Sequence, residues 1–110
     1  MLTISKTKED GRLLVSLEGQ LNATTTPQFD TELNNSLKNV TELILDFDKV
    51  DYVSSAGLRT VLGAQKTMNT QGAMKLINVD ETIREVFELT GFAKFLTIET
   101  KKRPEDELHE

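Results

Sequence analysis

The sequence predicts an α/β domain, with a mixed, mostly parallel sheet of four to five strands and helices packed mainly on one face. First, its 110 residues are the size of one domain. Second, apolar strand-like runs alternate with helical stretches in the order β-β-α-β-α-β-α, with a final β, which is typical of a parallel sheet. Third, each helical stretch has a single apolar stripe and therefore needs only one buried face.

The N-terminal segment is predicted to be an antiparallel β-hairpin. Leu2 and Ile4 alternate with polar residues, and residues 13–17 form a second apolar stretch. The intervening Glu9–Gly11 segment contains an Asp-Gly pair, which is a strong turn signal between two strands. We expect Gly19 to end the second strand.

Three helices are expected to begin at about Pro27, Ser55 and Asp80. The first has Pro at its first helical position, after a Thr, and the third has Asp as its N-cap. Glycines at 72 and 91 supply the stops of the second and third helices. The residues on the inward faces are Phe29, Leu33 and Leu37; Leu58, Val61, Leu62, Gln65 and Met68; and Ile83, Val86 and Phe87.

The remaining strands are placed between these helices. Residues 43–47 are nearly all apolar, which favours a central strand buried on both faces. Residues 48–53 are interpreted as a connector, and residues 74–79 as the next strand. Apolar residues within 92–98 suggest a last short packing segment or strand.

Composition and charge argue against several classes of function. The formal net charge of -5 disfavours binding to nucleic acid or anionic membranes, which needs a basic patch. The absence of cysteine excludes disulfides and cysteine-ligated metals and is consistent with a reducing cytoplasm. We see no secretory signal and no apolar run near the roughly 20 residues of a spanning helix. We therefore expect a soluble, cytoplasmic protein with no membrane insertion.

The domain is expected to cover residues 1–100, and residues 101–110 to form a charged, flexible tail that folding does not need. The single histidine, His109, lies in this tail. Asp46, Asp48 and Asp51 are close in sequence and could hold a magnesium ion, but solvated acids around a strand end are the favoured interpretation. No metal and no cofactor are expected.

The segment 46–63 is the most informative about function. Ser54 and Ser55 stand where a strand's connector meets a helix N-terminus, so one interpretation is that a serine caps the helix. The unpaired N–H groups and the dipole of that helix end can also hold a phosphate. A serine nucleophile would need a positioned base, and the expected domain contains no histidine and no Gly-x-Ser-x-Gly elbow. A hydrolase using Ser55 is therefore disfavoured. On the residues alone, capping is favoured over a switch.

This segment resembles the signature of the STAS family, the domain of anti-sigma factor antagonists and of sulphate transporter tails. The family pattern is an aspartate ending an apolar strand, followed by Asp-Ser-Ser/Thr-Gly-Leu opening a helix. The matching residues here are Asp46, Ser55, Gly57 and Leu58. Residues 17–22 resemble the family's Gly-x-Leu/Ile-Asp stretch, and 77–79 and 89–92 resemble its later strand and third-helix end. The similarity covers about residues 2–98.

Three positions depart from this pattern. Ser54 stands where the family has the aspartate before the serines, and Ala56 where many relatives have Ser or Thr. Asn22 replaces the usual aspartate. The alignment implies that Ser55 is the phosphorylated serine, with Ser54 as second choice.

The resemblance implies a partner-switching mechanism and no catalytic activity of the chain itself. The unphosphorylated form would bind an anti-sigma factor that is also a serine-protein kinase, and a sigma factor would be released. Phosphorylation would make the complex dissociate, and a serine phosphatase would restore the unphosphorylated protein. A monomer is the favoured oligomeric state. The partner-binding residues implied are Asn22, Ala23, Thr24, Ser54, Ser55, Ala56, Gly57, Leu58 and Arg59.

One other role is compatible with the same resemblance. A STAS-type regulatory subunit of a membrane transport ATPase would keep the fold and the binding face without a phosphate cycle. The tandem serines favour the sigma pathway.

Overall fold

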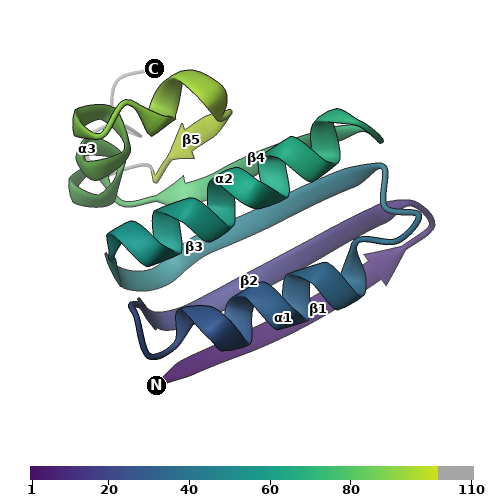
Figure 1. Cartoon of the computed structure of the whole chain (residues 1–110), viewed down its shortest axis with the longest axis horizontal. Helices are drawn as coiled ribbons and strands as arrows, with labels where there is room; N and C mark the ends of the chain where they lie inside the picture. Colours follow the sequence, from purple (N-terminus) through teal and green to yellow (C-terminus); the bar gives the residue numbers. More distant parts are fainter. Residues whose placement is uncertain (102–110) are drawn as a thin grey trace, which may run out of the picture.

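The computed structural model describes residues 1–101 and contains a five-stranded mixed sheet covered by helices (Figure 1). The elements in chain order are β1 (Leu2–Glu9), β2 (Arg12–Leu21), α1 (Thr26–Ser36), β3 (Glu42–Val53), α2 (Ser55–Asn69), β4 (Ala73–Val79), α3 (Glu81–Leu89), the short 3-10 helix η1 (Phe92–Phe95) and β5 (Ile98–Thr100). The strand order is β1-β2-β3-β4-β5; β1 and β2 are antiparallel, and all other neighbours are parallel. The predicted fold class is confirmed.

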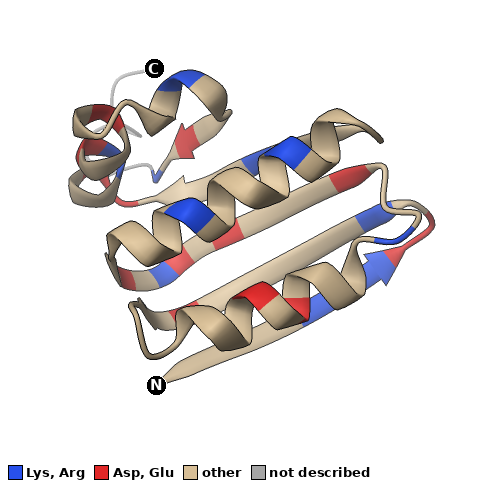
Figure 2. Ribbon diagram, viewed as in Figure 1, with Lys and Arg blue, Asp and Glu red and all other residues tan. Residues whose placement is uncertain are grey.

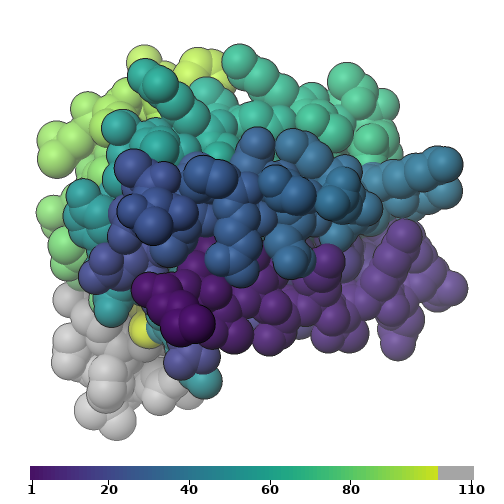
Figure 3. Space-filling model, turned by 60° about the horizontal axis from the view of Figure 1, so that its bottom comes forward, coloured from purple at the N-terminus to yellow at the C-terminus, as the bar shows by residue number. Residues whose placement is uncertain are grey.

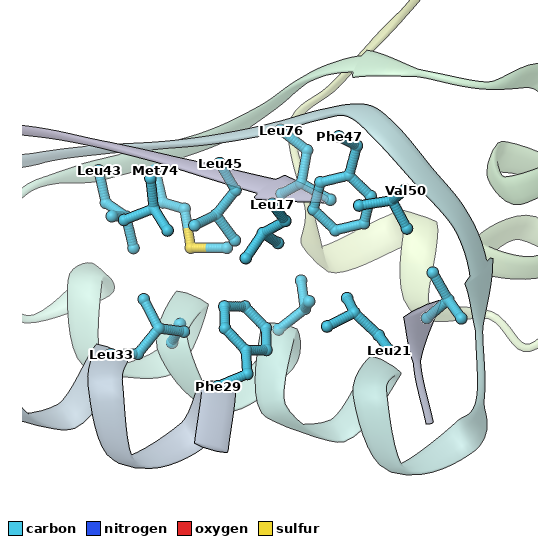
Figure 4. Packing of buried hydrophobic residues seen from close by; sticks show 14 of the residues in the cluster. Leu17, Leu21, Phe29, Leu33, Leu43, Leu45, Phe47, Val50, Met74 and Leu76 are labelled. Carbon is cyan, nitrogen blue, oxygen red and sulfur yellow. The ribbon is translucent and has the colours of Figure 1, made fainter. Parts of the chain in front are cut away.

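The helices form a second layer over one face of the sheet. α1 and α2 lie side by side across it, while α3 and η1 lie near β5 (Figure 1). Leu43 and Leu45 of β3 point from the sheet toward Phe29 and Leu33 of α1 (Figure 4). All four side chains are at least 97% buried, which makes this inter-layer space the hydrophobic core. α3 joins the same core, because the rings of Phe47 and Phe87 lie 6.3 Å apart between centroids.

The hairpin forms as predicted, but the second strand is longer than expected. Asp10 adopts a left-handed φ of 56° in the two-residue turn between Glu9 and Arg12. Gly19 does not end β2, so that prediction is wrong. It has a φ of 120° beside a register shift, and a Cβ there would lie 2.2 Å from the Met1 carbonyl oxygen. The glycine therefore allows the strand to bend and continue.

Residues 48–53 are not a connector, as predicted, but the second half of β3. Val50 and Val53 are buried and pair with Gly19 and Leu21 of β2. Two register shifts along this ladder absorb consecutive exposed residues such as Asp48 and Lys49. The bulges break the strict alternation that marks a strand in a sequence.

The helices begin where the sequence indicates. α1 begins at Thr26 with Pro27 in its first turn, and α3 follows Asp80, whose side chain accepts a hydrogen bond from the N–H of Thr82 at 2.8 Å. On the surface, β1 lies beside α1 (Figure 3). The Lys6 ammonium, on β1, forms an ion pair with a helix carboxylate, that of Glu32, at 2.9 Å.

Lys101, which the sequence places in the tail, is bound to the sheet. Its backbone N–H donates to the Val79 carbonyl oxygen at 2.8 Å, and its Nζ lies 3.1 Å from Asp48 Oδ1. The hydrogen bonding of the chain to β4 therefore extends to residue 101. The rest of the predicted tail, 102–110, including His109, lies outside the described residues.

Candidate functional site

The candidate site lies where the carboxyl ends of β2 and β3 meet the N-termini of α1 and α2 (Figure 1). Leu21 and Val53 are partners in the parallel ladder, so the segments that follow them start side by side. The backbone N–H of Ser54 donates to the Leu21 carbonyl oxygen at 2.7 Å. The structure thus brings together the two predicted groups, 22–24 and 54–59, which are about thirty residues apart in the chain.

The first group is a turn organised by Asn22. Its Oδ1 accepts hydrogen bonds from the N–H groups of Thr24 at 2.9 Å and Thr25 at 3.0 Å, and its Nδ2 donates to Gln20 Oε1 at 3.2 Å. Thr25 closes the turn, because its Oγ1 donates to the Gln20 carbonyl oxygen at 2.6 Å. Ala23 and Thr24 form the exposed tip. The sequence interpretation missed Thr25, although a hydroxyl residue next to a helix start is a usable signal.

In the second group, the two serines have different environments. Ser54 is the N-cap of α2: its Oγ accepts from the Gly57 N–H at 3.4 Å, and its carbonyl oxygen accepts from the Leu58 N–H at 3.0 Å. Ser55 is the first helical residue and is exposed, and its hydroxyl has no hydrogen-bond partner among residues 1–101. Capping is therefore done by Ser54, and the Ser55 hydroxyl is free.

Gly57 and Leu58 fix the helix start against the sheet. A Cβ on Gly57 would lie 2.9 Å from the Leu21 Cβ and 3.3 Å from Val53 Cγ1, so only glycine permits this approach. Leu58 is 2% exposed. Both were predicted to bind a partner, but the structure places them in the interior, where they position the turn and offer a partner almost no surface. Arg59, by contrast, is exposed.

The start of α2 can accept an anion. The N–H groups of Ser55 and Ala56, unlike those of the next two residues, have no acceptor in the described part of the chain. Free N–H groups and the positive end of the helix dipole stabilise a phosphate. A phosphate on the Ser55 oxygen would therefore lie beside suitable donors.

Asp46 and Asp48, in the middle of β3, make contacts within the sheet and with its edge. Asp46 Oδ1 accepts from the Asn78 Nδ2 and from the Asp48 N–H, both at 3.0 Å, and the Asp48 carboxylate pairs with Lys101. Between residues 1 and 101, no group of three His, Cys, Asp or Glu residues is placed to hold a metal ion. Within the same range, no helix is long and apolar enough to cross a membrane.

These features define a class of small α/β domains in which a hydroxyl-bearing turn opens the second helix at the carboxyl edge of the sheet. The chain belongs to the STAS domain family, whose model matches residues 3–105. The family and the fold expected from the sequence are thus confirmed, and the similarity to curated relatives places the chain among anti-sigma factor antagonists.

Three comparisons illustrate this similarity. BtrV of Bordetella bronchiseptica, which is assigned as an anti-sigma factor antagonist, is 34% identical over 99 residues, covering 88% of this chain and 85% of that protein. The crystal structure of an anti-sigma factor antagonist from Mycobacterium paratuberculosis superposes with a TM-score of 0.82 at 19% identity, covering 98% and 92% of the two chains. SpoIIAA of Bacillus in its phosphorylated form gives a TM-score of 0.69 at 21% identity, covering 97% and 100%.

Proposed function

We propose that this protein is a phosphorylation-controlled anti-sigma factor antagonist. In its unphosphorylated state it binds an anti-sigma factor that is also a serine-protein kinase, and a sigma factor is released. Phosphorylation of Ser55 switches it off. The observation that carries the proposal is the exposed, unbonded Ser55 hydroxyl at the start of α2, beside the turn shaped by Asn22.

The comparisons support the same direction. The relative BtrV is assigned as an anti-sigma factor antagonist, and SpoIIAA, which shares the fold, has been solved with its phosphate. In our proposal the chain is a binder and a substrate but not an enzyme, and it acts in the cytoplasm, where sigma factors work. Neither serine has a histidine partner within the described residues, which supports a non-catalytic role.

The docking surface would comprise Ala23 and Thr24 of the turn together with Ser55, Ala56 and Arg59 of α2. The kinase transfers the γ-phosphoryl group of ATP: Ser55 Oγ forms the new P–O bond, the bond to ADP breaks, and the hydroxyl proton passes to a base of the kinase. The phosphate brings a charge of about -1.5 to -2 to the centre of this surface. The cost of removing water from this phosphate would oppose docking. A serine phosphatase would restore the free hydroxyl by hydrolysing the phosphate ester.

The two serines provide the test. We expect Ser55→Ala to abolish phosphorylation by the cognate kinase with ATP and to keep binding, since only an exposed hydroxyl is lost. Ser54→Ala, the matched control, should still be phosphorylated, although it should lose about 0.5–2 kcal/mol of stability with the cap. Ser55→Asp should bind more weakly, with a partial effect because it carries less charge than phosphate.

Tandem mass spectrometry of the phosphopeptide decides the site, and calorimetry measures binding. Phosphate found on Ser54 alone, or undiminished phosphorylation of Ser55→Ala, would overturn the assignment. Equally tight binding of the phosphorylated form would contradict the switching mechanism.

A further inference from the structure

A groove between α1 and α2 begins next to the candidate site and runs along both helices. Its lining includes Pro27, Asp30 and Asn34 from α1, and Arg59, Gly63 and Ala64 from α2. We propose that this groove binds a helix of the anti-sigma factor, with basic residues facing α1 and acidic residues facing α2. The inference rests on the proposed function and extends the docking surface from Ser55 along α2.

The lining of the groove contains a glycine that the domain itself does not require. Gly63 lies in the middle of α2, where glycine is the poorest helix former after proline. A Cβ at Gly63 would meet nothing within 4 Å, in contrast to the crowding at Gly57. Its missing side chain therefore serves no internal packing, and it leaves room for a second backbone to approach closely.

The end of the groove nearest the site has an unused polar group. Thr26 lines the groove and is 8% exposed, and its Oγ1 is buried without a hydrogen-bond partner inside the described chain. A buried hydroxyl without a partner is costly, and native structures usually satisfy it. The oxygen has less than 1 Å² of accessible surface, so a polar side chain of a docked helix would provide that partner only if the Thr26 side chain rotates toward the groove on docking.

The two helices that line the groove contain charged residues of opposite sign (Figure 2). α1 contains Asp30 and Glu32 and no basic residue, whereas α2 contains Arg59 and Lys66 and no acidic residue. Glu32 pairs with Lys6 on the β1 side of α1, but Asp30 and Arg59 take part in none of the ion pairs among residues 1–101. A helix docked here would therefore place basic residues beside Asp30 and acidic residues beside Arg59. This pattern would also fix the direction in which the docked helix runs.

The shape of the groove favours a helix over a small ligand. It lies between two helices that run in the same direction, and small residues such as Gly63 and Ala64 are part of its lining. A third helix packs into such a depression at the usual separation of about 8–10 Å between axes. Since Arg59 belongs to both surfaces, one partner can contact the Ser55 turn and the groove at once.

Cross-linking can identify the occupant, because the chain contains no cysteine. A benzophenone maleimide on Gly63→Cys, irradiated in complex with an anti-sigma factor that binds the wild-type chain, should link to one helical segment with basic and acidic flanks. The same probe on Ala73→Cys should give no link, because this exposed position is the first residue of β4, at the end of the sheet away from the candidate site. Links from position 63 that are absent, or scattered over several segments, would overturn the proposal.

Affinity measurements separate the groove from the proposed function. Gly63→Gln and Asp30→Lys should each weaken binding by about 10-fold or more with no loss of melting temperature, while Ala73→Gln stays within about 2-fold of wild type. If both groove variants bind like wild type while Ser55→Asp binds weakly, the groove proposal fails and the proposed function stands. If no anti-sigma factor binds the wild-type chain, the proposed function fails and the groove proposal with it.

Discussion

Two neighbouring serines at the start of α2 differ in conformation, exposure and hydrogen bonding, although they are only one position apart. Ser54 is extended, half-buried and engaged in the cap, whereas Ser55 is helical, exposed and free. A sequence motif that contains both cannot separate these roles on the residues alone. The resemblance to the STAS pattern selected Ser55 as the phosphorylated serine. In the structure the side-chain cap of α2 comes from Ser54, so we expect modification of Ser55 to leave this cap in place.

Two glycines in α2 should respond to alanine in opposite ways. Gly57→Ala should destabilise the domain by about 1–3 kcal/mol, because the added methyl group overlaps Leu21 and overpacks the contact. Gly63→Ala should stabilise it by about 0.5–1 kcal/mol, because the helix gains a better former and the methyl group meets open space.

Urea denaturation measures both effects on the same helix, and each variant serves as the control for the other. Equal midpoints for the two variants would contradict the packing described at Gly57.

At the scale of the elements, the sequence predicted the helices and strands that have local start signals or a regular apolar period. Helix starts near Pro27, Ser55 and Asp80 were correct because caps and apolar stripes are local signals. The second half of β3 was missed because its pairing with β2 depends on bulges, which are set by a distant strand. The site was predicted as two separate segments. Their contact, through the bond between Ser54 and Leu21, required the register of the sheet.

The end of β5 gives a prediction at this scale. A chain ending at Thr100 should be less stable than one ending at Lys101 by about 0.5–1.5 kcal/mol, because it loses the backbone hydrogen bond to Val79. For a domain of this size, about 1 kcal/mol corresponds to roughly 4–8 °C in melting temperature.

The control is Lys101→Ala in the longer chain, which keeps the backbone bond to Val79 and removes the side-chain contacts with Asp48, namely the exposed ion pair and the hydrogen bond from Nζ to the Asp48 carbonyl oxygen. Identical melting temperatures for chains ending at 100 and at 101 would show that this bond contributes nothing.

For the whole molecule, the core that holds the two layers together is separate from the surface that we propose binds a partner. Leu17, Leu45 and Phe29 are buried between sheet and helices, while Ser55 and Arg59 lie outside. The Mycobacterium paratuberculosis antagonist, at only 19% identity, has the same fold with a TM-score of 0.82. The separation of core and surface also means that charge added at the site should leave the fold unchanged.

Phosphorylation should therefore stabilise the isolated domain slightly while it blocks docking. A phosphate on Ser55 lies at the positive end of α2, which favours it by about 0.3–1 kcal/mol at low salt, and the gain should shrink in 1 M salt.

Thermal unfolding of the phosphorylated and unmodified chains at both salt concentrations measures this difference, with Ser55→Asp expected to give a smaller shift of the same sign. A large drop in melting temperature on phosphorylation would indicate that the switch works by unfolding.

The contact of Gly57 with Leu21 has a consequence for how long a signal lasts. Because this close contact holds the helix start against the sheet, we expect phosphorylation to leave the turn in the same arrangement. In the mechanism we propose, the state of the switch then depends only on whether Ser55 carries the phosphate ester. The time for which the protein stays switched off is then set by the rate at which the phosphatase hydrolyses that ester.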